Sequence, residues 1–139
     1  MTTLEFTLRL LTALFSGMLI GIERQWHHKS AGLRTNTLVA TGAALFVLLS
    51  INLTQEQGDV TRIIGQVVTG IGFIGAGIIF KEGISVHGLT TAATVWCSSA
   101  IGCIAAAGYF IETLIGVAAI MSVNIILIPL DKWLSERKV

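Results

Sequence analysis

The chain has 139 residues, of which 53% are hydrophobic and 12% are charged, and its mean hydropathy is +0.81. Soluble domains carry about 25% charged residues, so this composition excludes a domain that folds in water and predicts one that folds in lipid. The formal net charge is +1, with nine Lys and Arg residues, which leaves no broad basic surface for a nucleic-acid partner. We therefore expect one membrane-embedded domain over residues 1–139.

Five apolar stretches of the chain lack Asp, Glu, Lys and Arg. A hydrocarbon core about 30 Å thick requires about 20 helical residues, and lipid requires the backbone groups to be satisfied within each segment. The predicted fold class is therefore all-α, a polytopic membrane bundle of five transmembrane helices packed through glycine-rich faces. The expected helices cover about residues 4–24, 35–53, 63–80, 88–107 and 112–131, followed by a short cytoplasmic tail over residues 132–139.

The distribution of basic residues predicts how the bundle is oriented. If the N-terminus lies outside, seven Lys and Arg residues fall on the inner side and only Arg9 and Arg62 fall on the outer side. Cytoplasmic loops carry an excess of Lys and Arg, so we expect the N-terminus outside and the C-terminus inside.

A weak internal repeat relates the first two expected helices to the next two. Phe15–Gly17 and Gly32–Thr35 are similar to Phe73–Gly75 and Gly88–Thr91, in the same order. A parallel repeat of this kind is used by some transporters. Chance similarity between glycine-rich apolar segments is the other interpretation.

The densest polar region is the expected inner rim of the bundle. Its simplest interpretation is positive-inside anchoring with ion pairs. A more specific interpretation pairs Glu23 with Arg34 or Lys81, which would lock the two inner loops together because an unpaired charge facing lipid is costly. The three histidines of this region would add pH sensitivity. The residues of this inner-rim charge site are Glu23, Arg24, Arg34, Lys81, Glu82 and His87.

The third expected helix is rich in glycine. Gly70–Gly75 spells a dinucleotide-binding fingerprint, but that motif requires a preceding strand and an acidic residue about 20 positions later, and neither is present. Glycines let membrane helices approach closely, so we interpret these residues as a helix-packing or partner face. A broken helix lining a polar cavity is the functional alternative. The glycines are Gly65, Gly70, Gly72, Gly75 and Gly77.

Hydroxyl residues form a polar stripe on the fourth expected helix, and an asparagine lies in the fifth. Such side chains commonly bond to the carbonyls of their own helix or across helices, and lining a polar path is the alternative. No nucleophile, base and orienting group can be assembled from the chain, so we expect neither an enzyme nor a catalytic, cofactor or metal site. The stripe consists of Thr91, Thr94, Ser98 and Asn124.

Five sequence blocks occur in order and together indicate a family. They are Gly21–Arg24, Ala31–Thr35, Gly70–Gly77, Lys81–Gly83 and Gly88–Cys97. Over about residues 7–128, the chain strongly resembles the MgtC/SapB family. Carried over by position, the family motif of the fourth helix falls on Gly88, Ala92, Trp96 and Cys97.

The resemblance implies a multi-pass protein of the bacterial inner membrane, linked to adaptation to low magnesium or acid and, in some pathogens, to virulence. It implies a non-enzymatic protein that regulates other membrane proteins, such as the F-type ATP synthase. A small transporter or channel for Mg²⁺ or another cation, with a polar path between two helical hairpins, is the alternative. The expected partners are membrane lipid and a second copy, since glycine-rich faces favour a homodimer. Many members continue into a soluble ACT-like domain, whereas this sequence ends at Val139.

Overall fold

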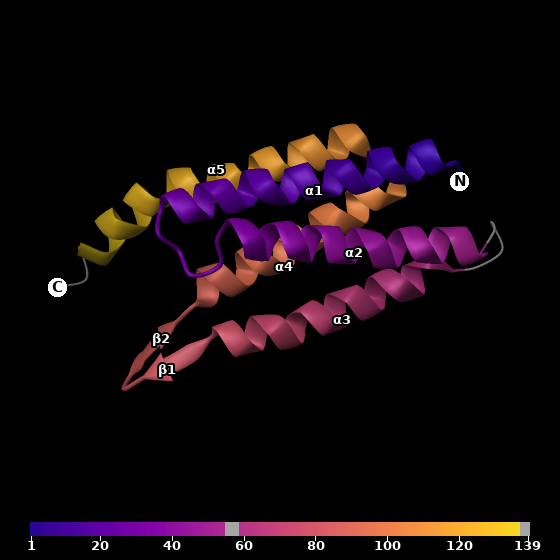
Figure 1. Cartoon of the computed structure of the whole chain (residues 1–139). Helices are drawn as coiled ribbons and strands as arrows, with labels where there is room; N and C mark the ends of the chain where they lie inside the picture. The colour runs from indigo at the N-terminus through magenta and orange to yellow at the C-terminus, as the bar shows by residue number, and fades with distance from the viewer. Residues whose placement is uncertain (55–58, 137–139) are drawn as a thin grey trace.

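The computed structural model describes residues 1–54 and 59–136, which form five long helices and one short β-hairpin (Figure 1). All five helices are long and apolar enough to cross a membrane. The chain is therefore an all-α, multi-pass membrane protein, as predicted. The elements are α1 (Thr3–Trp26), α2 (Leu33–Thr54), α3 (Val60–Ile78), β1 (Phe80–Glu82), β2 (Ser85–His87), α4 (Leu89–Ala107) and α5 (Phe110–Glu136).

The hairpin is the feature that the sequence pattern did not predict. The third helix was expected to reach residue 80, but α3 ends at Ile78, and β1 pairs with β2 in antiparallel register. The turn between the strands contains Gly83, whose φ of +60° is readily adopted only by glycine. Strands of three residues are too short to produce an alternating hydrophobic pattern, which is why the hairpin was missed. It projects from the same end of the bundle as that at which α1 ends (Figure 1).

The centre of the bundle is α4, which packs against all four other helices and is the most buried of them. Its core is built from small residues, so the helix backbones lie close together. A Cβ at Gly17 of α1 would lie 2.7 Å from the Asn36 backbone oxygen, and one at Gly102 of α4 would overlap the carbonyl of Ala40. The largest core cluster contains Ala13, Ala43, Ala44, Val47, Leu48, Cys103, Ala105 and Ala106.

The two helices at the margins are held less closely. The α5 helix contacts α1 and α4, and α3 contacts α4 and, less extensively, α2. Of the five candidate spans, α3 is the least buried. Figure 1 shows α3 below the compact group formed by α1, α2 and α4, so most of its circumference faces the membrane.

Candidate functional site

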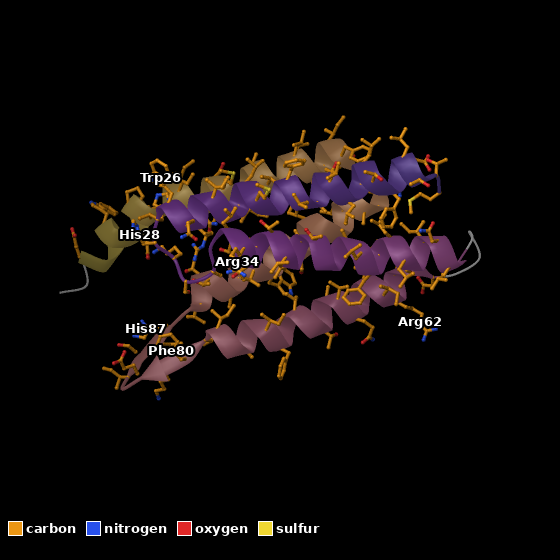
Figure 2. The ribbon with its side chains drawn as sticks, viewed as in Figure 1. Trp26, His28, Arg34, Arg62, Phe80 and His87 are labelled. Atoms are coloured by element: carbon orange, nitrogen blue, oxygen red, sulfur yellow. The ribbon has the colours of Figure 1, made fainter. Side chains whose placement is uncertain are left out.

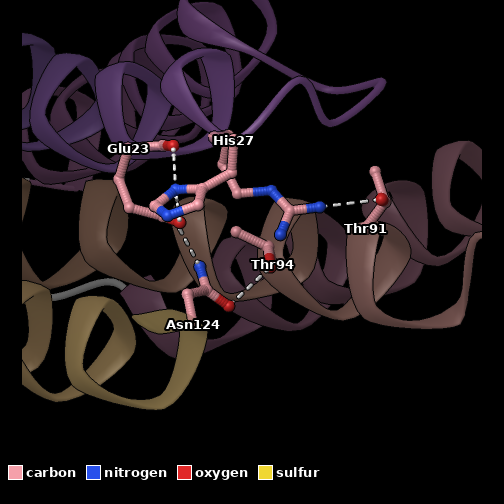
Figure 3. Close-up of polar contacts among 6 residues, drawn as sticks. Glu23, His27, Thr91, Thr94 and Asn124 are labelled. Carbon is pink, nitrogen blue, oxygen red and sulfur yellow. Dashed lines mark hydrogen bonds and ion pairs between the residues drawn. The ribbon is translucent and has the colours of Figure 1, made fainter. Parts of the chain in front are cut away.

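A buried polar network joins three helices at the end of α1 (Figure 3). Glu23 and Arg24 lie in the last turns of α1, with 5% and 2% of their surfaces exposed. The Arg24 Nη2 atom donates a 2.8 Å hydrogen bond to Thr91 Oγ1 on α4. On the other side, Asn124 Nδ2 of α5 donates to Glu23 Oε2 at 3.1 Å, and the Thr94 hydroxyl of α4 donates to Asn124 Oδ1 at 3.3 Å.

His27 connects this network to the surface. Its Nδ1 atom lies 2.9 Å from the backbone oxygen of Glu23 and 3.1 Å from Glu23 Oε1, which makes an ion pair when the imidazole is protonated. Both neighbours are acceptors, so Nδ1 is the nitrogen that carries a hydrogen. Glu23 Oε1 and Arg24 Nε have no hydrogen-bond partner among the described residues. Buried ionisable groups of this kind are costly in a membrane and mark functional sites.

A second polar contact links α4 to α2 through a residue that sequence reasoning missed. Ser98 of the predicted stripe donates a 2.8 Å hydrogen bond to Asn36 Oδ1. The Asn36 Nδ2 atom donates to the backbone oxygens of Ala31 and Gly32, at 2.8 and 3.0 Å. The only sequence signal for Asn36 is that it is an amide in an otherwise uncharged apolar stretch. All four residues of the predicted polar stripe are thus buried and bonded to other helices or to this network.

The structure divides the expected inner-rim charge site into two parts. Glu23 and Arg24 lie inside the bundle, whereas Lys81, Glu82 and His87 lie on the exposed hairpin. Glu23 pairs with neither Arg34 nor Lys81 in the described part of the chain; its side-chain contacts there are the hydrogen bond from Asn124 Nδ2 and the His27 imidazole 3.1 Å from Oε1. That part of the prediction is therefore wrong. The exposed rim residues outside the bundle are Arg34, Lys81, Glu82 and His87.

The hairpin has a local arrangement of its own. The His87 ring stacks on Phe80 with ring centroids 5.3 Å apart, and its Nε2 lies 3.9 Å from Glu82 Oε2. Figure 2 shows Phe80 and His87 out on the hairpin, while Arg34 lies beside the bundle. The charged groups on the hairpin therefore do not contribute to the buried network.

The glycines of α3 do not pack the bundle together. A Cβ added at Gly65, Gly70, Gly72 or Gly77 would meet no atom within 4 Å, and one at Gly75 would only touch the Ala92 Cβ at 3.8 Å. The close approaches within the bundle are made by glycines of α1 and α4 instead. The α3 glycines are thus available to a neighbour outside the described chain.

The side of α3 that faces the bundle and the side that faces away from it carry different kinds of residues. On the bundle side, Ile71 is buried and Val60, Ile64 and Val67 pack against the core, whereas the aliphatic residues Val68 and Ile74 are exposed. The opposite side carries small and polar residues at helical spacing, together with one aromatic ring, Phe73, that is 84% exposed. We call this row the α3 outward face; it consists of Gln66, Gly70, Phe73 and Gly77.

A groove flanks α3 on each side. One, of about 520 Å³, lies between α2 and α3 and contains Gln66 and Ser50. The other, of about 470 Å³, lies between α3 and α4 and contains two residues of the fourth-helix motif, Ala92 and Trp96. Gly88 precedes α4 with a φ of +86°, and Cys97 is a free, partly buried thiol. The family motif of α4 therefore lies partly along the groove beside α3.

No metal centre is formed by the part of the chain that the structure describes. Within residues 1–54 and 59–136, no group of three or more His, Cys, Asp or Glu residues could hold a metal ion. The sites that remain are the buried network around Glu23 and the open surface around α3.

Comparison with known proteins identifies the family. A family model described as MgtC family matches residues 10–133. Protein MgtC of Brucella abortus is 53% identical over 118 residues, which cover 85% of this chain and 49% of the relative. Protein MgtC of Salmonella typhimurium is 50% identical over 127 residues (91% and 54%), and an uncharacterized protein of Synechocystis is 50% identical over 133 residues (96% and 56%).

The chain spans about half the length of these curated relatives. No solved structure matches it. The matched residues 10–133 include parts of all five helices. Because the family model covers most of its length, the chain belongs to the MgtC family.

Proposed function

We propose that the protein is a non-enzymatic regulator of the bacterial inner membrane that acts in adaptation to low magnesium or acid. It works by lateral contact between its helices and other membrane proteins, for which the F-type ATP synthase is the candidate that the family resemblance suggests. The MgtC family membership supports the link to magnesium. The observation that carries the proposal is the α3 outward face.

A helix surface that faces only lipid is expected to carry large apolar side chains, because lipid solvates them well and small or polar groups gain nothing there. The α3 outward face departs from this expectation at every position except Phe73, since Gly70 and Gly77 leave its backbone accessible and Gln66 presents an amide. Small residues at such spacing allow another helix to approach closely, and an amide bonds to a polar group across the contact. The face therefore suits a protein helix better than lipid.

The test is capture of a membrane partner by the tagged protein from membranes of cells grown in low magnesium, with mild detergent and quantitative mass spectrometry. Gly70→Leu and Gly77→Leu place side chains on the α3 outward face, and each should reduce recovery of the partner at least tenfold. Gly42→Leu is the matched control, because Gly42 of α2 is another helical glycine with open space at its Cβ position. Unchanged capture by both α3 variants would overturn the proposal.

A second candidate function, a small cation transporter, is favoured by the buried network. Glu23 Oε1 and Arg24 Nε are buried without hydrogen-bond partners, and buried ionisable groups often lie on ion pathways in membranes. Glu23→Gln should then reduce Mg²⁺ or proton flux in proteoliposomes, whereas Glu82→Gln, on the exposed hairpin, should not. Flux through the unmodified protein equal to that of protein-free vesicles would exclude this function.

A further inference from the structure

The groove between α2 and α3 is mainly apolar, carries Asp59 and Arg62 at the start of α3, and contains two uncharged polar side chains without a hydrogen bond. Its apolar walls include the exposed side chains of Phe46, Leu49 and Leu53. Ser50 lines the same groove with only 6% of its surface exposed, and its hydroxyl makes no hydrogen bond to any residue that the structure describes. The exposed Gln66 amide likewise lacks a hydrogen bond in the described chain.

Both groups lie at membrane depth. Ser50 is four residues before the end of α2 and Gln66 is six residues after the start of α3, which correspond to roughly 6 and 9 Å of helix rise. A polar group left unpaired in hydrocarbon is costly. An acyl chain could fill the apolar walls of the groove but could not bond to either group. The occupant must therefore be mainly apolar and present a hydrogen-bonding group at this depth.

A second copy of α3 meets both requirements. Its own Gln66 has two N–H donors and an acceptor oxygen, so the amide can bond to the facing Gln66 and also to Ser50. No charged residue lies between Arg62 and Lys81, so no charge within the α3 span opposes the pairing, and Arg62 at the mouth of the groove is accompanied there by the carboxylate of Asp59. A two-fold axis along the membrane normal brings identical residues together and keeps the two α3 helices parallel. We propose that two copies of this chain pair through the α3 outward face, each α3 lying along the α2–α3 groove of the other.

The pairing would regulate the docking of a partner protein. This regulation, unlike the pairing itself, rests on the proposed function. A partner protein and a second copy would use the same face of α3, so they exclude each other. The dimer would then hold the regulator in a form that cannot engage its partner. The amount of free docking surface would depend on the concentration of the protein in the membrane.

The test is disulfide cross-linking in native membranes. In a background of Cys97→Ala and Cys103→Ala, which removes both native thiols, Gly70→Cys and Phe73→Cys, which leave the Gln66 amide in place, should each give a disulfide-linked dimer on mild oxidation. Ala119→Cys and Val123→Cys are the matched controls, because both are exposed on α5 and lie 9 and 13 residues after its start, much as Gly70 and Phe73 lie 10 and 13 residues after the start of α3. They should give at least tenfold less dimer. Two further variants are combined with Phe73→Cys, whose cross-linking yield reports the dimer. Gln66→Asn should retain the yield, and Gln66→Leu should lower it.

The possible outcomes are distinct. Equal dimer yields at α3 and α5 positions would indicate random collision and overturn the pairing, as would the absence of a dimer when all thiols are reactive to maleimide. A cross-link from Gly70→Cys to a different protein would also overturn it while supporting the proposed function. If the α3 dimer forms, the disulfide-linked protein should no longer capture the partner protein. Retained capture would mean that the partner binds another surface, and it would count against a face shared by the partner and the second copy.

Discussion

The Ser98 hydroxyl on α4 donates a 2.8 Å hydrogen bond to Asn36 Oδ1 on α2, and neither residue has any exposed surface. The amide of Asn36 also holds the backbone oxygens of Ala31 and Gly32 just before α2. One side chain therefore joins the α1–α2 connection to the central helix. This contact lies one helical turn from the close approach of Gly102 on α4 to Ala40 on α2.

Replacing Asn36 should destabilise the bundle more than replacing its partner. Asn36→Ala leaves the Ser98 hydroxyl and the Ala31 oxygen unpaired, and we expect it to lower the free energy of unfolding by about 2–3 kcal/mol. Ser98→Ala removes a single interhelical bond and should cost about 0.6 kcal/mol. Ser122→Ala is the control, since Ser122 is exposed and bonds only within α5. Equilibrium unfolding in bicelles measures the change in the free energy of unfolding for all three variants. A change for Asn36→Ala as small as that of the control would contradict the role of Asn36 in joining α2 to α4.

The number and type of the helices could be predicted because apolar length and charge position decide them in lipid. The partners of Glu23 could not, because Asn124 lies 101 residues further along the chain and only the packing of α5 against α1 brings the two together. Asn36 escaped notice for a related reason. A single amide in an apolar helix could face any of several neighbouring helices. Which neighbour it meets depends on how the helix is rotated about its axis, and the sequence does not give that rotation.

The glycines of the chain should divide into two classes when replaced by alanine. At Gly102 the added methyl group would collide with the Ala40 carbonyl, so Gly102→Ala should force α4 away from α2. Overpacking of this kind typically costs about 1–3 kcal/mol. Gly70→Ala meets open space and should be neutral or stabilise the monomer by up to about 1 kcal/mol through helix propensity. Thermal unfolding in detergent measures both, and equal effects would show that the α2–α4 contact is looser than described.

Removing the Glu23 carboxylate should be more damaging than neutralising it. Glu23→Leu leaves the buried Arg24 guanidinium without its nearest counter-charge and Asn124 Nδ2 without an acceptor. Leaving a buried hydrogen-bond donor unsatisfied costs about 1–3 kcal/mol. Glu23→Gln keeps an acceptor for Asn124, so it should lose less, and Glu82→Leu on the exposed hairpin should lose almost nothing. Protease susceptibility of α5 in membranes reports these differences; equal susceptibility of the two Glu23 variants would argue against the Asn124 contact.

The start of α3 should respond to acid through Asp59, which precedes the membrane-spanning segment. Its carboxylate accepts hydrogen bonds from the hydroxyl and the backbone N–H of Thr61, and these hold the pKa of Asp59 below its ordinary value. Because the pKa is lower in the folded state, the cap contributes fully above the ordinary value and is lost as the pH falls through the lowered one.

The first turn of α3 should therefore exchange its amide hydrogens faster, relative to intrinsic rates, only below about pH 4. Asp59→Asn provides the matched control, since asparagine caps helices as well as aspartate and does not titrate. Its protection should be independent of pH over the same range. The measurement is hydrogen exchange at the Thr61 amide, and protection that stays constant in acid in the unmodified protein would show that the Asp59 cap does not hold this turn.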